Sequence, residues 1–275
     1  MRNWLLALGV AALAIPTFLV VAEEIWSTEE GAHGPIVLAS VCWLVARQWP
    51  ELARAAKPPP LVQAAGWMVL ALLVYLFGRL VGILGVEVFG LVAVLIALFF
   101  AFGGLPGLRA MWFPILYLGF LVPLPDTVVD LVTQPMKLGI SSGATAVLRV
   151  LGYPIANTGV TIQVGPYQLL VATACSGLNS IISLSAIGLF YVYLMHRSSW
   201  RYALVLLAFV LPCALLANFA RVVLLVLLTY HAGDATAQGF LHEVAGTFTF
   251  VVALLGIFAI DRLLTPLRQR LTAAS

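Results

Sequence analysis

Three residues that are far apart in the sequence, Cys175, Arg221 and His242, could together perform thiol chemistry. A cysteine thiolate is a nucleophile, and a nearby histidine can take the thiol proton and later donate one to a leaving amine. A fixed guanidinium suits the oxyanion of a tetrahedral intermediate, or a grip on a substrate carbonyl. Each of the three lies near one end of a long apolar segment, so the arrangement of those segments decides whether they meet.

The composition is that of an integral membrane protein. The chain has 275 residues, of which 63% are hydrophobic and 9% are charged, and its mean hydropathy is +1.08. A soluble domain is nearer half apolar and a quarter charged. We therefore expect an all-α polytopic membrane protein that forms a single integral membrane domain, residues 1–275, in the lipid bilayer.

Apolar runs of bilayer-crossing length predict about eight transmembrane helices. Their expected ranges are 4–22, 34–49, 62–81, 86–104, 110–122, 177–195, 202–230 and 243–262. The fifth is short and could be tilted or partly re-entrant, and only Gly103-Gly104-Leu105-Pro106-Gly107 separates it from the fourth. The first resembles a secretion signal, but no cleavage site with small residues follows it, so we interpret it as a retained span. Lys57-Pro58-Pro59-Pro60 predicts a stiff connector.

The distribution of charge predicts an orientation with both termini in the cytoplasm. The cytoplasmic segments then hold ten of the 14 basic residues, namely Arg2, Arg47, Arg54, Lys57, Arg109, Arg197, Arg201, Arg262, Arg268 and Arg270. The outer segments hold nine of the 11 acidic residues, namely Glu23, Glu24, Glu29, Glu30, Glu87, Asp126, Asp130, Asp234 and Glu243. The basic clusters thus mark membrane sidedness and give no case for nucleic-acid binding.

One sizeable insertion, about residues 122–174, is expected on the outer side. Residues 126–151 carry Asp130, Gln134, Lys137 and Ser141 at helical spacing, which predicts an amphipathic helix on the membrane surface. From Tyr153 to Ala174 the period changes to alternation, with a Gly-Pro turn at 165–166. This pattern predicts a β-hairpin that leads directly into Cys175.

The three reactive residues are expected to share one depth in the membrane. Cys175 lies 21 residues before His196, Arg221 lies 20 after Arg201, and His242 lies 20 before Arg262. At 1.5 Å per helical residue, each is about 30 Å from the inner boundary. Their common level at the outer edge of the hydrocarbon favours a shared site.

Each residue has a structural alternative. Cys175, expected at a helix N-terminus that lowers the pKa of a thiol, could instead be a buried inert cysteine. Arg221, with Asn218 on the same helix face, could snorkel to the head groups. His242 could be an ordinary interfacial histidine, and His231 and His33 compete for its role, although a continuous helix would place His231 about 15 Å beyond Arg221.

The other two cysteines do not extend the candidate site. Cys42 and Cys213 fall near the middle of apolar runs, where a small apolar residue is expected. The three cysteines have no zinc or CxxC spacing, so no metal site is predicted.

These residues resemble the exosortase/archaeosortase family of membrane cysteine transpeptidases. The resemblance rests on ACSGL at Ala174–Leu178, on NFAR at Asn218–Arg221, and on His242 at the start of the last span. The segment Gly31-Ala32-His33-Gly34-Pro35 is similar to the family's element after the first span. Two positions depart from the pattern: Thr173 stands where many members have an acidic residue, and Asn179 where many have a basic one.

The resemblance implies a protein-sorting peptidase or transpeptidase with catalytic Cys175, Arg221 and His242 and no metal or organic cofactor. The implied partners are secreted proteins with a C-terminal tail, made of a short PEP-like motif, an apolar helix and a basic cluster. The thioester acyl-enzyme would pass to an amine, a glycolipid-type acceptor or water, at the periplasmic face of a bacterial inner membrane. The candidates for support or substrate binding are His33, Asn179, Asn218 and Glu243.

Two other functions fit a polytopic protein with these residues. One is a non-enzymatic component of exopolysaccharide export, in which Arg221 and His242 line a polar path. The other is a membrane acyltransferase that uses the thiol of Cys175. The common depth of Cys175, Arg221 and His242 favours the peptidase class.

Overall fold

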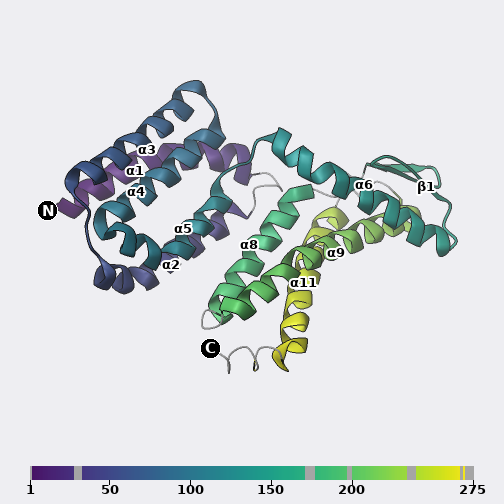
Figure 1. Cartoon of the computed structure of the whole chain (residues 1–275). Coiled ribbons are helices and arrows are strands. Elements are labelled where there is room, and N and C mark those ends of the chain that lie inside the picture. The colour runs from purple at the N-terminus through teal and green to yellow at the C-terminus, as the bar shows by residue number, and fades with distance from the viewer. Residues whose placement is uncertain are drawn as a thin grey trace. The chain divides into compact units, whose positions relative to one another are not determined.

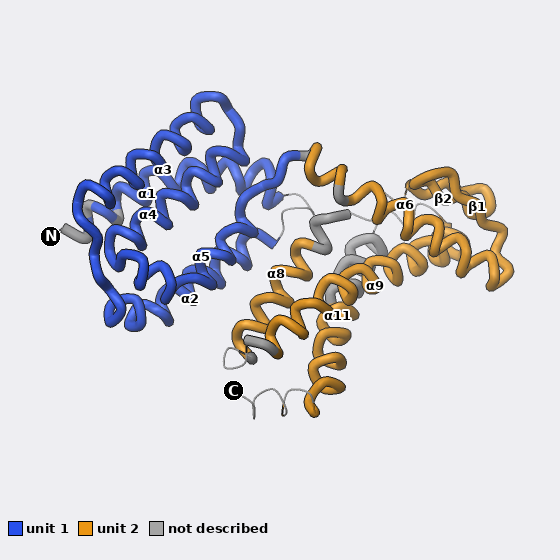
Figure 2. Tube along the Cα trace, in the orientation of Figure 1, with its two compact units in different colours: residues 1–125 blue, residues 126–275 orange. Residues whose placement is uncertain are grey.

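The computed structural model describes residues 2–27, 33–170, 177–196, 200–233, 240–266 and 269. It divides into two compact units, residues 1–125 and 126–275, which are coloured separately in Figure 2 and described one at a time. The expected single membrane domain stays a prediction.

The first unit is helical throughout its described part (Figure 1). Its elements are α1 (Arg2–Val21), the π-helical turn η1 (Ala22–Trp26), α2 (Gly34–Ala55), α3 (Leu61–Val81), α4 (Leu84–Ala110), α5 (Trp112–Leu118) and the 3-10 turn η2 (Gly119–Leu121). The connector from Lys57 to Pro60 is non-helical, and the amide of Lys57 donates to the carbonyl of Gly103 at 3.0 Å. The predicted connector is therefore confirmed as an extended link fixed to α4.

Helices α3 and α4 form a tight hairpin because glycines let their backbones touch. Gly82 ends α3 with φ of 74°, a left-handed conformation that favours glycine. A Cβ on Gly78 would overlap the backbone of Glu87, and one on Gly90 would overlap the backbone of Tyr75. Small residues at such contacts let membrane helices pack closely.

A buried polar network joins α1 to this hairpin. The Thr17 hydroxyl donates to Glu87 Oε1 at 2.6 Å and lies 3.0 Å from the Tyr75 hydroxyl. Arg79 Nη1 donates to the same Glu87 oxygen at 2.7 Å. Tyr75 also donates to the carbonyl of Leu13 at 3.1 Å, and Leu13 lies three residues before Pro16 inside α1. The network thus satisfies polar groups of three helices around one carboxylate that is 7% exposed.

Replacing that carboxylate should loosen the first unit. Glu87→Ala removes the acceptor of Thr17 and Arg79, and we expect a loss of about 1–3 kcal/mol because Arg79 keeps access to solvent. The apparent melting temperature of the detergent-solubilised protein should fall, whereas Glu24→Ala, at an exposed position, should not change it. Equal melting temperatures for the two variants would contradict a supporting role for Glu87.

Four helices in the described part are long and apolar enough to cross a membrane: Leu8–Trp26, Leu61–Val81, Leu84–Ala110 and Tyr202–Ala232. These support the first, third, fourth and seventh predicted spans, and the second, sixth and eighth stay predictions. The predicted break between the fourth and fifth spans is confirmed at Gly104, whose backbone (φ 60°, ψ −161°) is non-helical and kinks α4. The fifth segment, predicted over 110–122, is a seven-residue α5 followed by η2, which is too short for a span.

The second unit combines long helices with a small sheet (Figure 1). Its elements are α6 (Asp126–Val150), β1 (Ile155–Thr158), β2 (Thr161–Val164), β3 (Tyr167–Leu170), α8 (Gly177–His196), α9 (Trp200–Ala232) and α11 (Phe240–Leu263). The helix predicted over 126–151 is confirmed. The predicted hairpin is instead a three-stranded antiparallel sheet of order β1-β2-β3.

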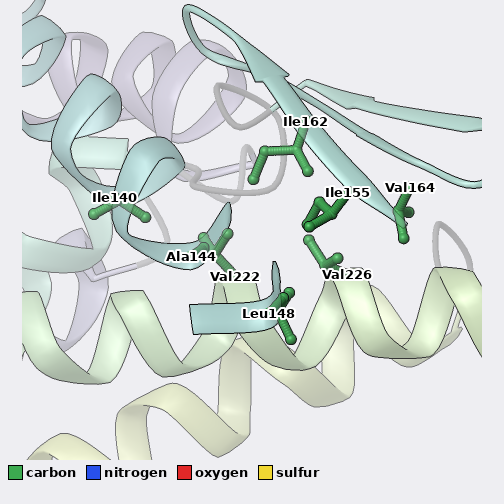
Figure 3. Packing of buried hydrophobic residues seen from close by; sticks show 8 residues of the cluster. All are labelled: Ile140, Ala144, Leu148, Ile155, Ile162, Val164, Val222 and Val226. Carbon is green, nitrogen blue, oxygen red and sulfur yellow. The ribbon is translucent and has the colours of Figure 1, made fainter. Parts of the chain in front are cut away.

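The sheet packs against α6 and the far half of α9. The two turns contain Gly159 and Gly165, both with positive φ, and each joins its strands through two residues. Alternation along β2 buries Ile162 and Val164. Figure 3 shows them with the other members of one apolar cluster, Ile140, Ala144, Leu148, Ile155, Val222 and Val226. The sheet thus packs β2 and β3 onto α9.

Helices α8, α9 and α11 form a three-helix bundle whose register is set at two levels. At one end, Asp261 accepts hydrogen bonds from the hydroxyls of Tyr191 at 2.6 Å and Tyr202 at 2.7 Å. Further along, a Cβ on Gly188 would lie 2.7 Å from Val210 Cγ1 and 3.2 Å from Ile257 Cδ1. One residue from each helix meets at each level.

Enlarging Gly188 should wedge this bundle apart. Gly188→Val would place methyl groups where Val210 and Ile257 already lie, and overpacking of this kind costs about 1–3 kcal/mol. The matched control is Gly139→Ala in α6, where a Cβ meets nothing within 4 Å. Thermal unfolding in detergent should show a lower melting temperature for Gly188→Val alone, and an unchanged value would contradict the close packing.

Candidate functional site

Arg221 is buried inside the second unit. It lies in α9 and is 2% exposed, as is Asn218 three residues earlier. Residues three apart on a helix share one face. Snorkelling of Arg221 to the head groups, which the sequence left open, is therefore wrong, because a snorkelling side chain would be exposed. A guanidinium buried in an apolar helix is costly, and such residues are functional candidates.

Two packing contacts place these polar residues between the side of α9 that packs on α6 and the side that packs on α8 and α11. Val222, one residue after Arg221, packs against α6 and the sheet. Ala217, one residue before Asn218, packs with Leu184 of α8 and Ala253 of α11. Asn218 and Arg221 therefore lie where the two packed faces of α9 meet.

Cys175 lies outside the described residues, which resume at Gly177, the first residue of α8. On its other side the described chain ends with β3 at Leu170. Leu169 of β3 packs against Leu225, which is one turn of α9 from Arg221. The strand that leads toward Cys175 therefore runs beside the helix that carries Arg221.

The hydrogen bonds of Asp261 give a common reference level from which the distances of Arg221, His242 and the start of α8 along their helices can be compared. Arg221 lies 19 residues after Tyr202, and His242 lies 19 residues before Asp261. Since Tyr202 and Asp261 are hydrogen-bonded, both backbones are about 28 Å from that level. Gly177 lies 14 residues from Tyr191, or about 21 Å along α8 from the same level. The helices thus carry Arg221, His242 and the start of α8 toward one end of the bundle.

The other candidates of the second unit are placed by their backbones alone. His242 and Glu243 lie in the first turn of α11, and Asn179 lies in the first turn of α8. Their side chains lie outside the described part of the chain. Their roles stay predictions.

His231 has structural partners of its own. Helix α9 continues to Ala232, as the sequence argument required, so His231 is ten residues, or about 15 Å, beyond Arg221. Its Nε2 lies 3.2 Å from the Tyr153 hydroxyl, and its ring packs edge-on against Tyr153 and Tyr230. His231 is thereby a contact between α9 and the segment before β1.

The remaining candidates lie elsewhere. His33 belongs to the first unit, where it caps α2 and its carbonyl accepts from the amide of Val37 at 3.0 Å. Its part in the site stays a prediction. Cys213 is buried between α9 and its neighbours, and Cys42 is exposed on α2.

Sequence reasoning missed a row of buried hydroxyls on α6, namely Thr133, Ser141 and Thr145, which are at most 2% exposed. Ser141 was assigned to a polar surface that faces outward, and that assignment is wrong. Asp130 and Gln134, which share the predicted polar face, are exposed, whereas Ser141 lies on the part of α6 that α9 and the sheet cover. The helix alone carries no signal for which of its polar residues a neighbouring element covers.

A family model described as transmembrane exosortase matches residues 25–259. The chain belongs to that family. The resemblance found from ACSGL, NFAR and the late histidine is thus confirmed at the level of the family. Membership supports a membrane sorting role of the transpeptidase kind in a multi-pass membrane protein. Searches of curated proteins and of solved structures find no match.

Proposed function

We propose that this exosortase-family chain is a membrane cysteine transpeptidase that cleaves the C-terminal tail of secreted proteins. The observation that carries the proposal is the burial of Arg221 near the end of the bundle where α8 and α11 begin. Cys175 is two residues before Gly177 in the sequence, and the proposal puts its thiol beside that helix start. A catalytic arginine needs such a position, inside the protein and close to the thiol.

The proposed reaction divides one difficult step into two. The Cys175 thiol gives its proton to His242, and the thiolate attacks the scissile carbonyl to form a C–S bond. Arg221 stabilises the oxyanion of the tetrahedral intermediate. The C–N bond then breaks as His242 returns the proton to the leaving amine. The thioester is opened by an acceptor amine, a glycolipid-type acceptor or water, and the thiol is regenerated.

The proposed setting is the outer face of a bacterial inner membrane, with both termini in the cytoplasm. A tail with an apolar helix and a basic cluster would adopt the same sidedness as the spans of this chain, since the basic residues stay inside. Its scissile bond would then reach the outer edge of the hydrocarbon, the level assigned to Cys175. His33, Asn179, Asn218 and Glu243 are proposed as supporting residues.

The test is co-expression with a secreted protein that bears such a tail. Wild type should shorten the substrate, and variants of Cys175, Arg221 and His242 should leave it intact while reaching the membrane in normal amounts. His231→Ala is the matched control for His242→Ala, because His231 is held by Tyr153 and Tyr230. If every variant cleaved the tail equally, Cys175 would be structural, and the export-component function would replace this one. A trapped fatty acyl thioester in place of a peptide one would favour the acyltransferase.

A further inference from the structure

The hydroxyl row of α6 consists of Thr133, Ser141 and Thr145, whose side-chain oxygens are buried and have no hydrogen-bond partner among the described residues. The same holds for Oδ1 of Asn218 on α9. Buried polar groups in proteins are nearly always hydrogen-bonded, so each exception calls for a partner. Four such oxygens in one unit indicate a shared ligand.

Other hydroxyls in the described part of the chain bond to their own helix. Ser142, the neighbour of Ser141, bonds to the carbonyl of Leu138 at 2.9 Å. Thr229, buried in α9, bonds to the carbonyl of Leu225 at 2.8 Å. This back-bonding is the usual fate of a helical serine or threonine. The hydroxyl row departs from it, so its oxygens remain available to a group from outside the helix.

The later part of the row, Ser141 and Thr145, lies on the stretch of α6 that meets α9. Ile140 and Ala144, each one residue before a member of the row, belong with Val222 to the cluster of Figure 3. Gly143 lies against Phe219, whose ring would be 3.2 Å from an added Cβ. Phe219 is between Asn218 and Arg221 in sequence. The unpartnered oxygens of Ser141, Thr145 and Asn218 therefore flank the helix contact beside the proposed catalytic arginine.

The spacing of the row matches an extended peptide. Along a helix, Thr133 and Ser141 are about 12 Å apart and Ser141 and Thr145 about 6 Å. An extended chain presents its main-chain groups to one side every two residues, which is about 6.6 Å. Hydroxyls both donate and accept, so they can pair with amides and carbonyls in alternation. Lys137, between Thr133 and Ser141, is already paired with Asp130 at 3.5 Å.

We propose that Thr133, Ser141 and Thr145, with Asn218, form the wall that binds the main chain of the substrate's extended segment next to the scissile bond. The inference rests on the proposed function, because it names the part of the same site that holds the peptide. Recognition through the main chain would fix the depth of the scissile bond without reading side chains. These are positioning residues, since they do not touch the reacting atoms.

The test measures peptide binding separately from cleavage. The probe is a fluorescein-labelled tail peptide, with its motif, apolar helix and basic cluster, added to the full chain in nanodiscs in a Cys175→Ala background. Thr133→Val, Ser141→Ala and Thr145→Val should each weaken binding about 3- to 10-fold. Ser142→Ala, one residue away with a locally satisfied hydroxyl, should bind as the Cys175→Ala parent does.

A second peptide tests the main chain directly. N-methylation of the amides beside the scissile bond removes donors and keeps the side chains. It should weaken binding to the parent protein, and weaken it less when the three hydroxyls are already replaced, as expected for groups in contact. The melting temperature of the free protein should not fall in the triple variant, because its hydroxyls have no internal partner to lose.

Two results would overturn the inference: a triple variant that binds as Ser142→Ala does, or a lower melting temperature of the free triple variant. Failure of the proposed function is distinguishable, because it would appear as a parent protein that does not bind the tail peptide, or as a bound tail that the protein with intact Cys175 does not cleave.

Discussion

A Cys175→Ala variant should leave the tail of a co-expressed substrate uncut, with cleavage reduced about a thousandfold or more. The expected size follows from the chemistry, because removing the nucleophile removes the thioester route and leaves only binding and oxyanion stabilisation. The measurement is substrate mobility on a gel, normalised to the amount of enzyme in the membrane fraction. A hydroxylamine-sensitive adduct with the substrate should form on wild type and be missing from the variant, since hydroxylamine cleaves thioesters.

The other two cysteines provide matched controls for Cys175→Ala. Cys213 is buried with Val210 and Ile257, and Cys42 is exposed on α2. Cys213→Ala should cost about 1 kcal/mol of stability at most and leave cleavage unchanged, as should Cys42→Ala. Cleavage by Cys175→Ala within a few-fold of wild type would exclude the thiol mechanism.

The sequence predicts the helices well because each needs an apolar run of fixed length. The ranges 62–81, 177–195 and 202–230 differ from α3, α8 and α9 by at most two residues at either end. The equal spacings from Arg201 to Arg221 and from His242 to Arg262 anticipate the level at which Tyr202 and Asp261 are hydrogen-bonded. Basic residues mark one membrane boundary, and the helical rise converts each spacing into a distance from it. Because the rise per residue is constant, the depth of a helical residue in the membrane can be predicted from its position in the sequence.

The packing of one element against another cannot be predicted from the sequence in the same way. Strand β1 was missed because Asn157, Thr158 and Gly159 are typical turn residues, yet Ile155 is drawn into the apolar cluster on α6 and α9. By contrast, the break at Gly104 was predicted, because a run of glycines with a proline marks a local interruption of a helix. At β1, contacts with other elements outweigh the local preference.

The candidate site likewise has one part that the sequence predicted and one part that it did not. Arg221 was found because a lone charge in an apolar helix is visible in the sequence. The hydroxyl row was not found, because serine and threonine are common in membrane helices and usually bond to their own backbone. Ser141 and Thr145 are buried because α9 and the sheet pack over this part of α6, and only that burial makes their lack of a hydrogen-bond partner unusual.

Arg221→Met should reduce cleavage about 100- to 1000-fold, the usual cost of removing one oxyanion donor. Methionine keeps much of the volume and removes the buried charge, so the fold should persist. Arg221→Lys retains the charge but not the planar fork of donors, and should still lose about tenfold or more. If Arg221 acts in the transition state, kcat and kcat/KM should fall together, whereas a residue that only grips the substrate would raise KM.

Arg149 is the matched control for this pair of variants. It lies in the last turn of α6, is exposed, and reaches the carbonyl of Ile155 only at 3.5 Å. Arg149→Met should therefore cleave as wild type does, with an unchanged melting temperature. If Arg221→Met and Arg221→Lys both cleaved the tail within twofold of the wild-type rate, the buried guanidinium would have a structural role in the bundle and no role in the reaction. The loss in Arg221→Lys, which keeps the charge, would instead identify the geometry of the guanidinium as the feature that the site requires.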